Sequence, residues 1–166
     1  MNNEKMILRV ATPEDAVICG QIAIEAWAPV RKSMRELIGE DIYSLFGDQK
    51  EQKRHEVMGV FTDDRIQVLV TEIDGRVVGF ITYVILKNIN GVKFGEIGNN
   101  AVAPSVGRRG IGTFQCQQII SRMKEQGVAF ILVDTGLDES HAPARRMYEK
   151  AGFDRSFEHV TYYVKT

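Results

Sequence analysis

The distribution of apolar and polar residues in the middle of the chain is typical of β-strands. The runs "RIQVLVTEI" and "RVVGFITYVIL" are rich in β-branched residues and end near polar, glycine-containing dipeptides. Asp74-Gly75 separates the two runs, Asn90-Gly91 follows the second, and both dipeptides favour tight hairpin turns. Together with the next stretch, "VKFGEIGNNAVA", this pattern predicts an antiparallel meander of three strands.

Helical and strand patterns alternate in the second half of the chain. Apolar residues first recur at helical spacing, at Cys116, Ile119, Ile120 and Met123. The continuous apolar run "VAFILVD" then predicts a strand that is buried on both faces. A second short helix is expected next, and "HVTYYVK" is predicted to close the chain as a strand.

The first 64 residues show a less regular pattern. "MILRV" predicts a short strand, and "ATPEDA" predicts the start of a helix. The stretch from Arg31 to Phe61 is rich in charge and is expected to be helical in pieces that break near Gly39 and Gly47, although its exact course is not predicted. Because no repeat, low-complexity tract or linker divides the chain, residues 1–166 are expected to form a single mixed α/β domain.

Composition narrows the classes of function. The 166 residues are 44% hydrophobic and 26% charged, with a net charge of −1. These values are typical of a globular domain and offer no general attraction for nucleic acid or an acidic membrane. No apolar run approaches the ~18 residues of a membrane span, and the first residues hold no apolar signal region, so a cytoplasmic protein is expected. Cys19 and Cys116 are expected to be free, packed thiols.

The stretch "GRRGIG", residues 107–112, lies between the third predicted strand of the meander and the helix that follows. Glycines at such a junction let backbone N–H groups surround an anion, and the positive end of the helix dipole adds to the attraction. Arg108 and Arg109 supply local positive charge. The stretch predicts a phosphate or pyrophosphate site, and the alternative is a glycine-rich turn with solvated arginines.

Two other phosphate-binding motifs do not fit this stretch. A P-loop needs a lysine followed by serine or threonine after its last glycine, and Thr113-Phe114 stand there instead. A dinucleotide fingerprint needs a glycine where Gln115 stands, and it opens a parallel strand–helix unit rather than following a meander. A nucleoside-triphosphate-binding domain is therefore disfavoured.

Several stretches resemble the signature segments of one superfamily. "VAP", which ends at Pro104, and "GRRGIG" are similar to its strand end and its loop Arg/Gln-x-x-Gly-x-Gly/Ala. "HAPARRMYEKAGF" is similar to its segment Asn-x-x-Ala-x-x-hydrophobic-Tyr-x-x-x-Gly-Phe, and "LRVATPEDA" with "EAWAP" resembles its N-terminal strand and helix. From about Ile7 onward, apart from residues 31–64, the chain thus resembles the GNAT acetyltransferases.

This resemblance implies a fold and an activity. The fold is a central, largely antiparallel twisted sheet with a splayed strand pair and about four helices. The activity is direct transfer of the acetyl group of acetyl-CoA to a primary amine of a small molecule, protein or peptide, with residues 31–64 shaping the acceptor site. The sequence does not identify the acceptor, and it leaves open whether the chain forms a homodimer. The alternative is a non-catalytic acyl-CoA-binding sensor or scaffold of the same fold.

The contacts of the family to its cofactor carry over to matching positions. The strand before the loop would pair with the pantetheine arm, and Val102 N–H is the family's usual donor to the thioester oxygen. Independently, a bulge near Gly98 would splay this strand from "FILVD" and free its backbone groups. Three positions depart from the family pattern, namely Gly107, Arg108 and His141 in place of Arg or Gln, Gly and Asn. The implied cofactor-binding residues are Asn100, Ala101, Val102, Gly107, Arg108, Arg109, Gly110, Ile111, Gly112, Thr113 and His141.

The resemblance also implies catalytic roles. Tyr148 would protonate the leaving thiolate, although a tyrosine on an apolar helix face is also typical of a packed core residue. Glu96 would act as the base through a water molecule, and the alternative is a surface glutamate in an alternating strand. Asn99 could order that water instead. Trp27 and Asn99 are candidates for binding the acceptor, and no metal is expected because the histidines lie far apart in sequence.

Overall fold

The computed structural model describes residues 5–87, 90–107 and 109–166. Within these residues the chain forms one five-stranded sheet in the order β1-β2-β3-β4-β5. The strands are β1 (Met6–Val10), β2 (Gln67–Ile73), β3 (Arg76–Lys87), β4 (Lys93–Val102) and β5 (Phe130–Val133). The strands β1 to β4 pair antiparallel, whereas β5 runs parallel to β4. The predicted antiparallel meander, which corresponds to β2, β3 and β4, is therefore confirmed.

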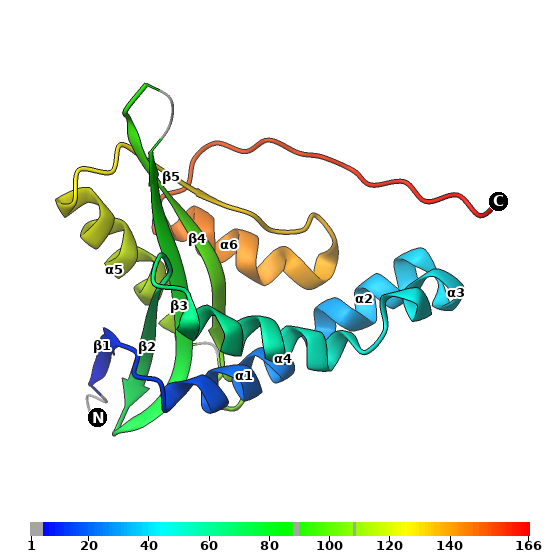
Figure 1. Cartoon of the computed structure of the whole chain (residues 1–166), viewed down its shortest axis with the longest axis horizontal. Coiled ribbons are helices and arrows are strands. Elements are labelled where there is room, and N and C mark those ends of the chain that lie inside the picture. The colour runs from blue at the N-terminus through cyan, green and yellow to red at the C-terminus, as the bar shows by residue number, and fades with distance from the viewer. Residues whose placement is uncertain (1–4, 88–89, 108) are drawn as a thin grey trace.

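Helices cover both faces of the sheet (Figure 1). The α-helices are α1 (Asp15–Ala26), α2 (Ala28–Ile38), α3 (Glu40–Tyr43), α4 (Gln49–Gly59), α5 (Ile111–Glu125) and α6 (Ala142–Ala151). The helical pieces expected between Arg31 and Phe61 are confirmed as α3, α4 and most of α2, with breaks at Gly39 and Gly47. The described residues thus form six α-helices rather than about four. None of the helices in these residues is both long and apolar enough to span a membrane.

Alternating residues of the strands divide the apolar core into two layers. One layer joins the sheet to α5 and α6, and its buried members are Leu69, Ile81, Tyr83, Ile97, Cys116, Ile119, Met123 and Tyr148. The other joins the sheet to α1 and α4, and its buried members are Cys19, Ile22, Ala23, Val57, Val70, Phe80 and Ala101. Both cysteines are free and buried, as expected.

The hairpin between β2 and β3 has the turn that its sequence predicts. Asp74 and Gly75 both adopt positive φ, at 50° and 73°. This is the backbone that a two-residue turn needs to match the twist of its strands. Asp74 is the only residue other than glycine with positive φ in the described part of the chain.

A bulge interrupts β4 where the sequence predicts one. Tyr83 pairs with Ile97 but Ile81 pairs with Asn100, so β4 contains one extra residue between these two pairs. The parallel pairing of β4 with β5 also ends at Ile97. Beyond the bulge, β4 and β5 separate, and the edge of β4 that faces β5 is open from Gly98 to Val102. The splayed strand pair is confirmed.

Two sequence predictions for the end of the chain are wrong. The strand β5 is not buried on both faces, because Phe130 is 70% exposed and Leu132 is also exposed. The stretch "HVTYYVK" forms no strand, and residues 154–166 run as an extended segment over the outside of the molecule (Figure 1). A strand requires a partner edge as well as β-forming residues, and this segment has no backbone partner within the described residues.

Candidate active site

A cavity of about 530 Å³ lies between the open end of β4, the N-terminus of α5 and one face of α6. The residues that line it are Ala26, Asn100, Ala101, Val102, Gly107, Arg109, Gly110, Ile111, Gly112, Thr113, Pro143, Ala144, Arg146, Met147, Tyr148 and Lys150. The strand pairs with β3 along one edge and contributes its other edge, which β5 leaves unpaired, and the helix contributes a positive dipole end. The cavity thus combines an open strand edge with an anion-attracting helix end.

The glycines of the loop shape the start of α5. Gly110 precedes the helix in the left-handed conformation, with φ 74° and ψ 10°, and Gly107 has φ 70°. Side chains other than glycine rarely adopt such angles. Gly112 leaves space for a different reason: a Cβ there would collide with Met147 Sδ, so the methionine side chain would have to move, and it would lie against Val102. The glycine lets α5 approach α6 and β4 closely, so only small groups fit between them.

The Tyr148 side chain belongs to both the core and the cavity. It is buried, packs edge-to-face on Phe153 with ring centroids 5.7 Å apart, and lines the cavity wall. Burial raises the pKa of its hydroxyl above the usual range, and the neighbouring Cys116 contributes in the same direction. At neutral pH the phenol therefore keeps its proton, which is the state required of a proton donor.

The side chain of Asn100 turns toward the helices rather than into solvent. Its Nδ2 donates to Cys116 Sγ at 3.1 Å. Burial raises the pKa of the Cys116 thiol to about 12, so this thiol remains protonated and is a packing residue rather than a nucleophile. The contact fixes the strand against α5 at the point where β4 leaves β5.

A second group of residues lies on the α1 and α4 side of the sheet. Lys53 Nζ donates to Asn99 Oδ1 at 2.6 Å and to Glu56 at 2.9 Å, and it lies 4.2 Å from the centre of the Trp27 ring. The Asn99 amide also donates to Glu56 at 3.2 Å. Trp27 and Asn99, which the sequence analysis assigned to the acceptor, are thus brought together around one ammonium group. The arrangement shows that this region accommodates a cationic nitrogen.

Comparison with known proteins identifies the family. The family model described as "Acetyltransferase (GNAT) family" matches residues 31–153, about three quarters of the chain. The chain belongs to the GNAT acetyltransferase family. It is accordingly an acyltransferase by family, and the resemblance inferred from its sequence is confirmed.

Solved structures agree with this family at low sequence identity. A transcriptional regulator from Bacillus halodurans is 18% identical with a TM-score of 0.69, covering 96% of this chain and 100% of its own. A ribosomal-protein-alanine N-acetyltransferase from Brucella melitensis is 14% identical with a TM-score of 0.62, covering 97% and 100%. An aminoglycoside N-acetyltransferase in complex with CoA is 17% identical with a TM-score of 0.60, covering 99% and 97%. No curated protein sequence matches the chain. These likenesses establish the shared fold.

Most of the cofactor-binding residues predicted for this GNAT acetyltransferase line the cavity. The structure gathers residues 100–102, Gly107 and residues 109–113 there from two elements. Two of the predicted cofactor-binding residues are not among those that line the cavity. Arg108 lies outside the described residues, and His141 is not among the residues lining the cavity. The roles of all these residues in binding acetyl-CoA remain predictions.

His141 instead takes part in a hydrogen-bonded cluster at the start of α6. Its Nδ1 lies 2.6 Å from Asp138 Oδ2, and Ser33 of α2 donates to the same carboxylate at 2.8 Å. Partial burial raises the pKa of Asp138, but hydrogen bonds from Ser140, Ser33 and His141 outweigh it and hold that pKa well below its usual range. The ionised carboxylate thus links α2 to the loop that precedes α6.

Glu96 lies on the opposite face of β4 from the core residue Ile97. It pairs with Val84 of β3 and with Leu132 of β5, and it is half-buried. Strand alternation therefore directs its side chain to the same side of the sheet as Asn99 and α4. Tyr148 and Glu96 therefore lie on opposite faces of the sheet, near the point where β4 and β5 separate.

One wall of the cavity was predicted only in part from the sequence. In α6, Tyr148 was assigned to the site and Met147 to the apolar inner face, whereas Pro143, Arg146, Met147 and Lys150 all line the cavity. These four residues follow the spacing i, i+3, i+4 and i+7, which marks a second helix face next to the core face. The sequence signal that could have predicted this wall is the mixture of two cationic residues with apolar residues on one face of α6.

Proposed function

We propose that this protein is an acetyl-CoA-dependent N-acetyltransferase that moves an acetyl group directly to a primary amine. The observation that carries the proposal is the open edge of β4 from Gly98 to Val102, which leads into the cavity at the N-terminus of α5. An extended amide-containing chain can pair with such an edge as an additional strand would. The phosphate groups at the other end of the same ligand suit the helix end.

The residues around the cavity fit CoA in charge as well as shape. Backbone N–H groups from Gly110 to Thr113 lie at the positive end of α5, where a pyrophosphate is stabilised. Arg109, Arg146 and Lys150 add positive charge to the same cavity. We assign Val102 N–H to the thioester oxygen, which gains negative charge as the amine attacks.

Tyr148 is the proposed general acid. In the reaction, the amine nitrogen forms a bond to the acetyl carbonyl carbon and the carbon–sulfur bond breaks, so the sulfur departs as a thiolate. Tyr148 donates its proton to that sulfur. The support for this role is its raised pKa, which keeps the hydroxyl protonated, together with its place in the cavity wall.

Glu96 is the proposed base. An alkyl amine has a pKa near ~10.4 and is mostly charged at neutral pH, so it must lose a proton before it can attack. Glu96 lies on the α4 side of β4, and a water molecule would carry the proton to its carboxylate. In the structure Asn99 has its side chain engaged by Lys53 and Glu56, which favours Glu96 over Asn99 as the group that handles the proton.

The acceptor is proposed to be a small-molecule or peptide amine that enters between α1, α2 and α4. Trp27 and Glu56 hold the ammonium group of Lys53 with a ring face and a carboxylate, and an acceptor ammonium that displaces Lys53 would bind the same two groups. Similar structures are named for aminoglycoside and ribosomal-protein-alanine acetylation, so both classes belong in a substrate screen.

Release of free CoA thiol from acetyl-CoA tests this function. The purified protein is mixed with acetyl-CoA and a panel of aminoglycosides, polyamines and peptides with free N-termini. Thiol release that depends on an amine, with a matching gain of one acetyl group by the amine, supports the enzyme. Tight acetyl-CoA binding without release for any amine would favour the sensor or scaffold.

A further inference from the structure

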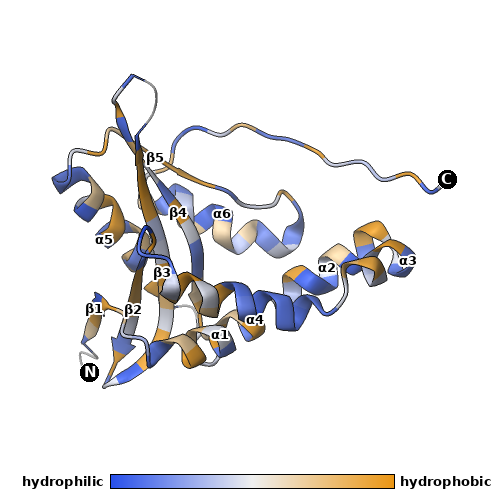
Figure 2. Cartoon of the chain, viewed as in Figure 1, coloured by the Kyte–Doolittle hydropathy of each residue, from blue (hydrophilic) through white to orange (hydrophobic). Residues whose placement is uncertain are grey.

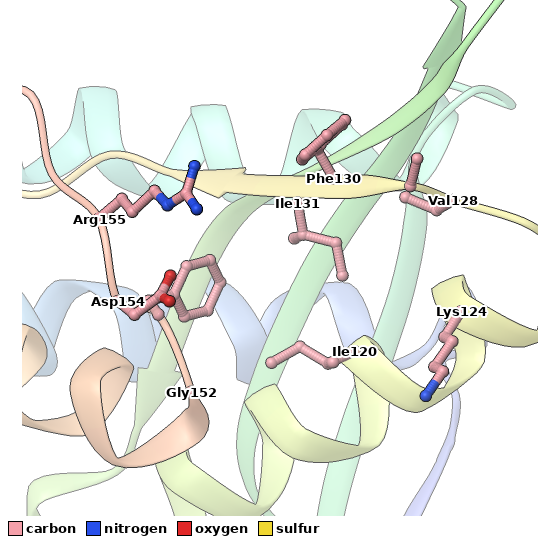
Figure 3. Close-up of a pocket in the computed structure, with 10 residues that line it drawn as sticks. Ile120, Lys124, Val128, Phe130, Ile131, Gly152, Asp154 and Arg155 are labelled. Atoms are coloured by element: carbon pink, nitrogen blue, oxygen red, sulfur yellow. The ribbon is translucent and has the colours of Figure 1, made fainter.

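A cavity of about 560 Å³, separate from the proposed active site, does not suit an amine. It lies between α5, β5 and the residues that follow α6, where Ile131 points toward Ile120 (Figure 3). Lys124 and Arg155 line this cavity together with a single carboxylate, that of Asp154. Because like charges repel, the two cations disfavour an ammonium group there. The other face of the sheet, which α4 covers, is better suited to bind an amine.

The helix α4 is mostly hydrophilic (Figure 2), and its two lysines differ in exposure. Lys50 is exposed, whereas only 16% of the Lys53 side chain is exposed. A lysine that is enclosed in this way loses the rotamer freedom that it would have in water, which opposes folding. The contacts that the Lys53 ammonium group makes offset this loss.

Three oxygen atoms and one aromatic ring surround Lys53 Nζ. Asn99 Oδ1 lies at 2.6 Å, and the two carboxylate oxygens of Glu56 lie at 2.9 and 3.1 Å. The centre of the Trp27 ring is 4.2 Å away. A primary ammonium has three N–H donors, which these oxygens match in number, and the ring face attracts its positive charge. Trp27, Glu56 and Asn99, here called the ammonium site, thus suit a primary ammonium rather than a guanidinium or a quaternary group.

Two contacts that do not involve Lys53 hold Asn99 in this orientation. Its backbone N–H donates to Thr82 Oγ1 at 2.8 Å, and its side-chain Nδ2 donates to Glu56 at 3.2 Å. Because Nδ2 is directed to Glu56, Oδ1 is free to accept from an ammonium group. The acceptor atoms of the ammonium site are therefore in place for another amine that replaces Lys53.

The ammonium site borders the proposed active site. Ala26, which precedes Trp27, and Asn100, which follows Asn99, both line the active-site cavity. Asn99 also belongs to the open edge of β4, where we assign the thioester. An amine bound at the ammonium site would thus lie at the border of the cavity proposed for acetyl-CoA.

We propose that Lys53 competes with the acceptor for the ammonium site, and that the acceptor is a primary amine at the end of an unbranched alkyl chain. The acceptor role rests on the proposed acetyltransferase function, whereas binding of the amine does not. Lys53 reaches the site through a stem of four methylene groups, so the space that it vacates has the width of such a chain. An α-amine is wider, because its carbon carries a carbonyl group and a side chain. Lysine side chains and alkyl diamines share the chemistry that fits.

A competitor within the same chain weakens the apparent binding of the acceptor. Half of the Glu56 side chain is exposed, so its ion pair with Lys53 is partly solvated and can open. The apparent dissociation constant equals the intrinsic constant divided by the fraction of molecules whose site is open. If about 10% of molecules are open, removal of Lys53 tightens binding about tenfold. A lysine with only a structural role would not produce such a gain.

Fluorescence of Trp27 tests the proposal without acetyl-CoA, because Trp27 is the single tryptophan of the chain. We expect n-pentylamine to bind Lys53→Ala about tenfold more tightly than it binds the wild type. Glu56→Gln, added to Lys53→Ala, should remove most of this gain. Lys50→Ala makes the same change at the exposed lysine of the same helix and should bind n-pentylamine as the wild type does.

Other amines test the shape of the acceptor and its source. Alanine amide, an α-amine, should bind Lys53→Ala more weakly than n-pentylamine does, at a pH of about 6.5 where both amines are charged. Nα-acetyl-lysine amide and 1,5-diaminopentane represent a protein side chain and a free diamine. Both should bind Lys53→Ala more tightly than the wild type, and the tighter of the two identifies the source of the acceptor.

The outcomes separate this proposal from the proposed function. Circular dichroism confirms that each variant is folded, and Lys53→Met takes the place of Lys53→Ala if the alanine variant does not fold. Unchanged or weaker binding of n-pentylamine in the folded variant would overturn the proposal, and so would equal binding of alanine amide. Amine binding without acetyl transfer would contradict only the enzyme. Acetyl transfer with an amine KM that Lys53→Ala leaves unchanged would contradict only the competition by Lys53.

Discussion

Thr82 Oγ1 occupies the space that a Cβ of Gly98 would need. A Cβ added to Gly98 would lie only 2.8 Å from this oxygen, which also accepts a hydrogen bond from Asn99 N at 2.8 Å. The threonine hydroxyl therefore serves as the partner for the extra residue of the β4 bulge. This pair of residues on adjacent strands sets where β4 turns away from β5.

The bulge should be sensitive to a single methyl group. Gly98→Ala forces Thr82 or the strand to move, so we expect a loss of about 1–3 kcal/mol of unfolding free energy. We also expect weaker acetyl-CoA binding, because the freed edge of β4 shifts. Chemical denaturation and calorimetry measure the two effects. Gly59→Ala, at a glycine with nothing within 4 Å of an added Cβ, is the control and should show neither.

Gly112→Glu should abolish acetyl-CoA binding. The side chain would collide with Met147 and place a negative charge beside the proposed pyrophosphate site. Like-charge contact costs several kcal/mol, so the dissociation constant should rise about 100-fold or more. Titration calorimetry on a variant shown to be folded makes the measurement. Gly59→Glu is the control, because it makes the same change at an exposed site and should leave acetyl-CoA binding unchanged. Unchanged acetyl-CoA binding in Gly112→Glu would contradict the proposed pyrophosphate site.

Tyr148→Phe should lower kcat by a factor of ~10²–10⁴ if the hydroxyl is the general acid. The ring, and with it the packing on Phe153, is retained. The KM for acetyl-CoA should change little. Tyr83→Phe removes another buried hydroxyl from the same core and should retain activity. Full activity of Tyr148→Phe, with the chemical step shown to be rate-limiting, would mean that Tyr148 is a packing residue and not the general acid.

Glu96→Gln should lower kcat/KM for the amine by about 10²-fold at neutral pH. The loss should shrink as the pH rises toward the pKa of the amine, because more of the acceptor is then already deprotonated. A pH–rate profile of both proteins makes the comparison, with the exposed Glu125→Gln as control. A loss that is the same at every pH would instead assign Glu96 to acceptor binding.

Asp15 should make the fold sensitive to acid. Hydrogen bonds from Arg9 at 2.7 and 3.0 Å hold the pKa of this buried carboxyl below its usual range. Because the folded pKa is the lower one, the stabilisation is complete above the unfolded value near ~3.9 and is lost as the pH falls through the folded value. Asp15→Asn should cost about 2 kcal/mol at neutral pH.

The pH dependence provides the check on that assignment. The difference in unfolding free energy between wild type and Asp15→Asn should narrow as the pH drops below about 4. Denaturant titrations at several pH values measure it. Asp64→Asn, at an exposed site, should follow the wild type throughout. A difference that does not change with pH would mean that Asp15 acts through packing alone.

Much of the fold follows from local sequence. Asp74-Gly75 produces the expected two-residue turn because few other residues tolerate positive φ at both positions. "GRRGIG" predicts the junction before α5 for the same reason, since Gly107 and Gly110 have positive φ. Gly98 predicts the bulge for another reason, because it leaves room for Thr82 Oγ1. Between Arg31 and Phe61 the sequence predicts helical pieces broken near Gly39 and Gly47, but not their exact course, because α3 is only four residues long and the apolar positions of the charged α4 show little periodicity.

The candidate site is predictable only in part. The loop and strand residues that line the cavity follow from motifs contiguous in sequence, and so does Tyr148. Arg146 and Lys150 join the cavity because α6 is rotated to bury Tyr148, which turns its neighbouring face toward the loop. Lys53, Trp27 and Asn99 come from three separate parts of the chain. Their spacing in the sequence does not predict that their side chains contact one another.

The sequence by itself determined the turns, the bulge, the anion-attracting loop and the family, because each depends on the backbone freedom or chemistry of adjacent residues. Only the tertiary structure decided that β5 is half-exposed and that residues 154–166 do not pair within the chain. Val160, Tyr162 and Val164 alternate as a strand should, yet a strand forms only where a free edge is within reach. Alternation is a property of the segment, whereas the partner edge is a property of the whole fold.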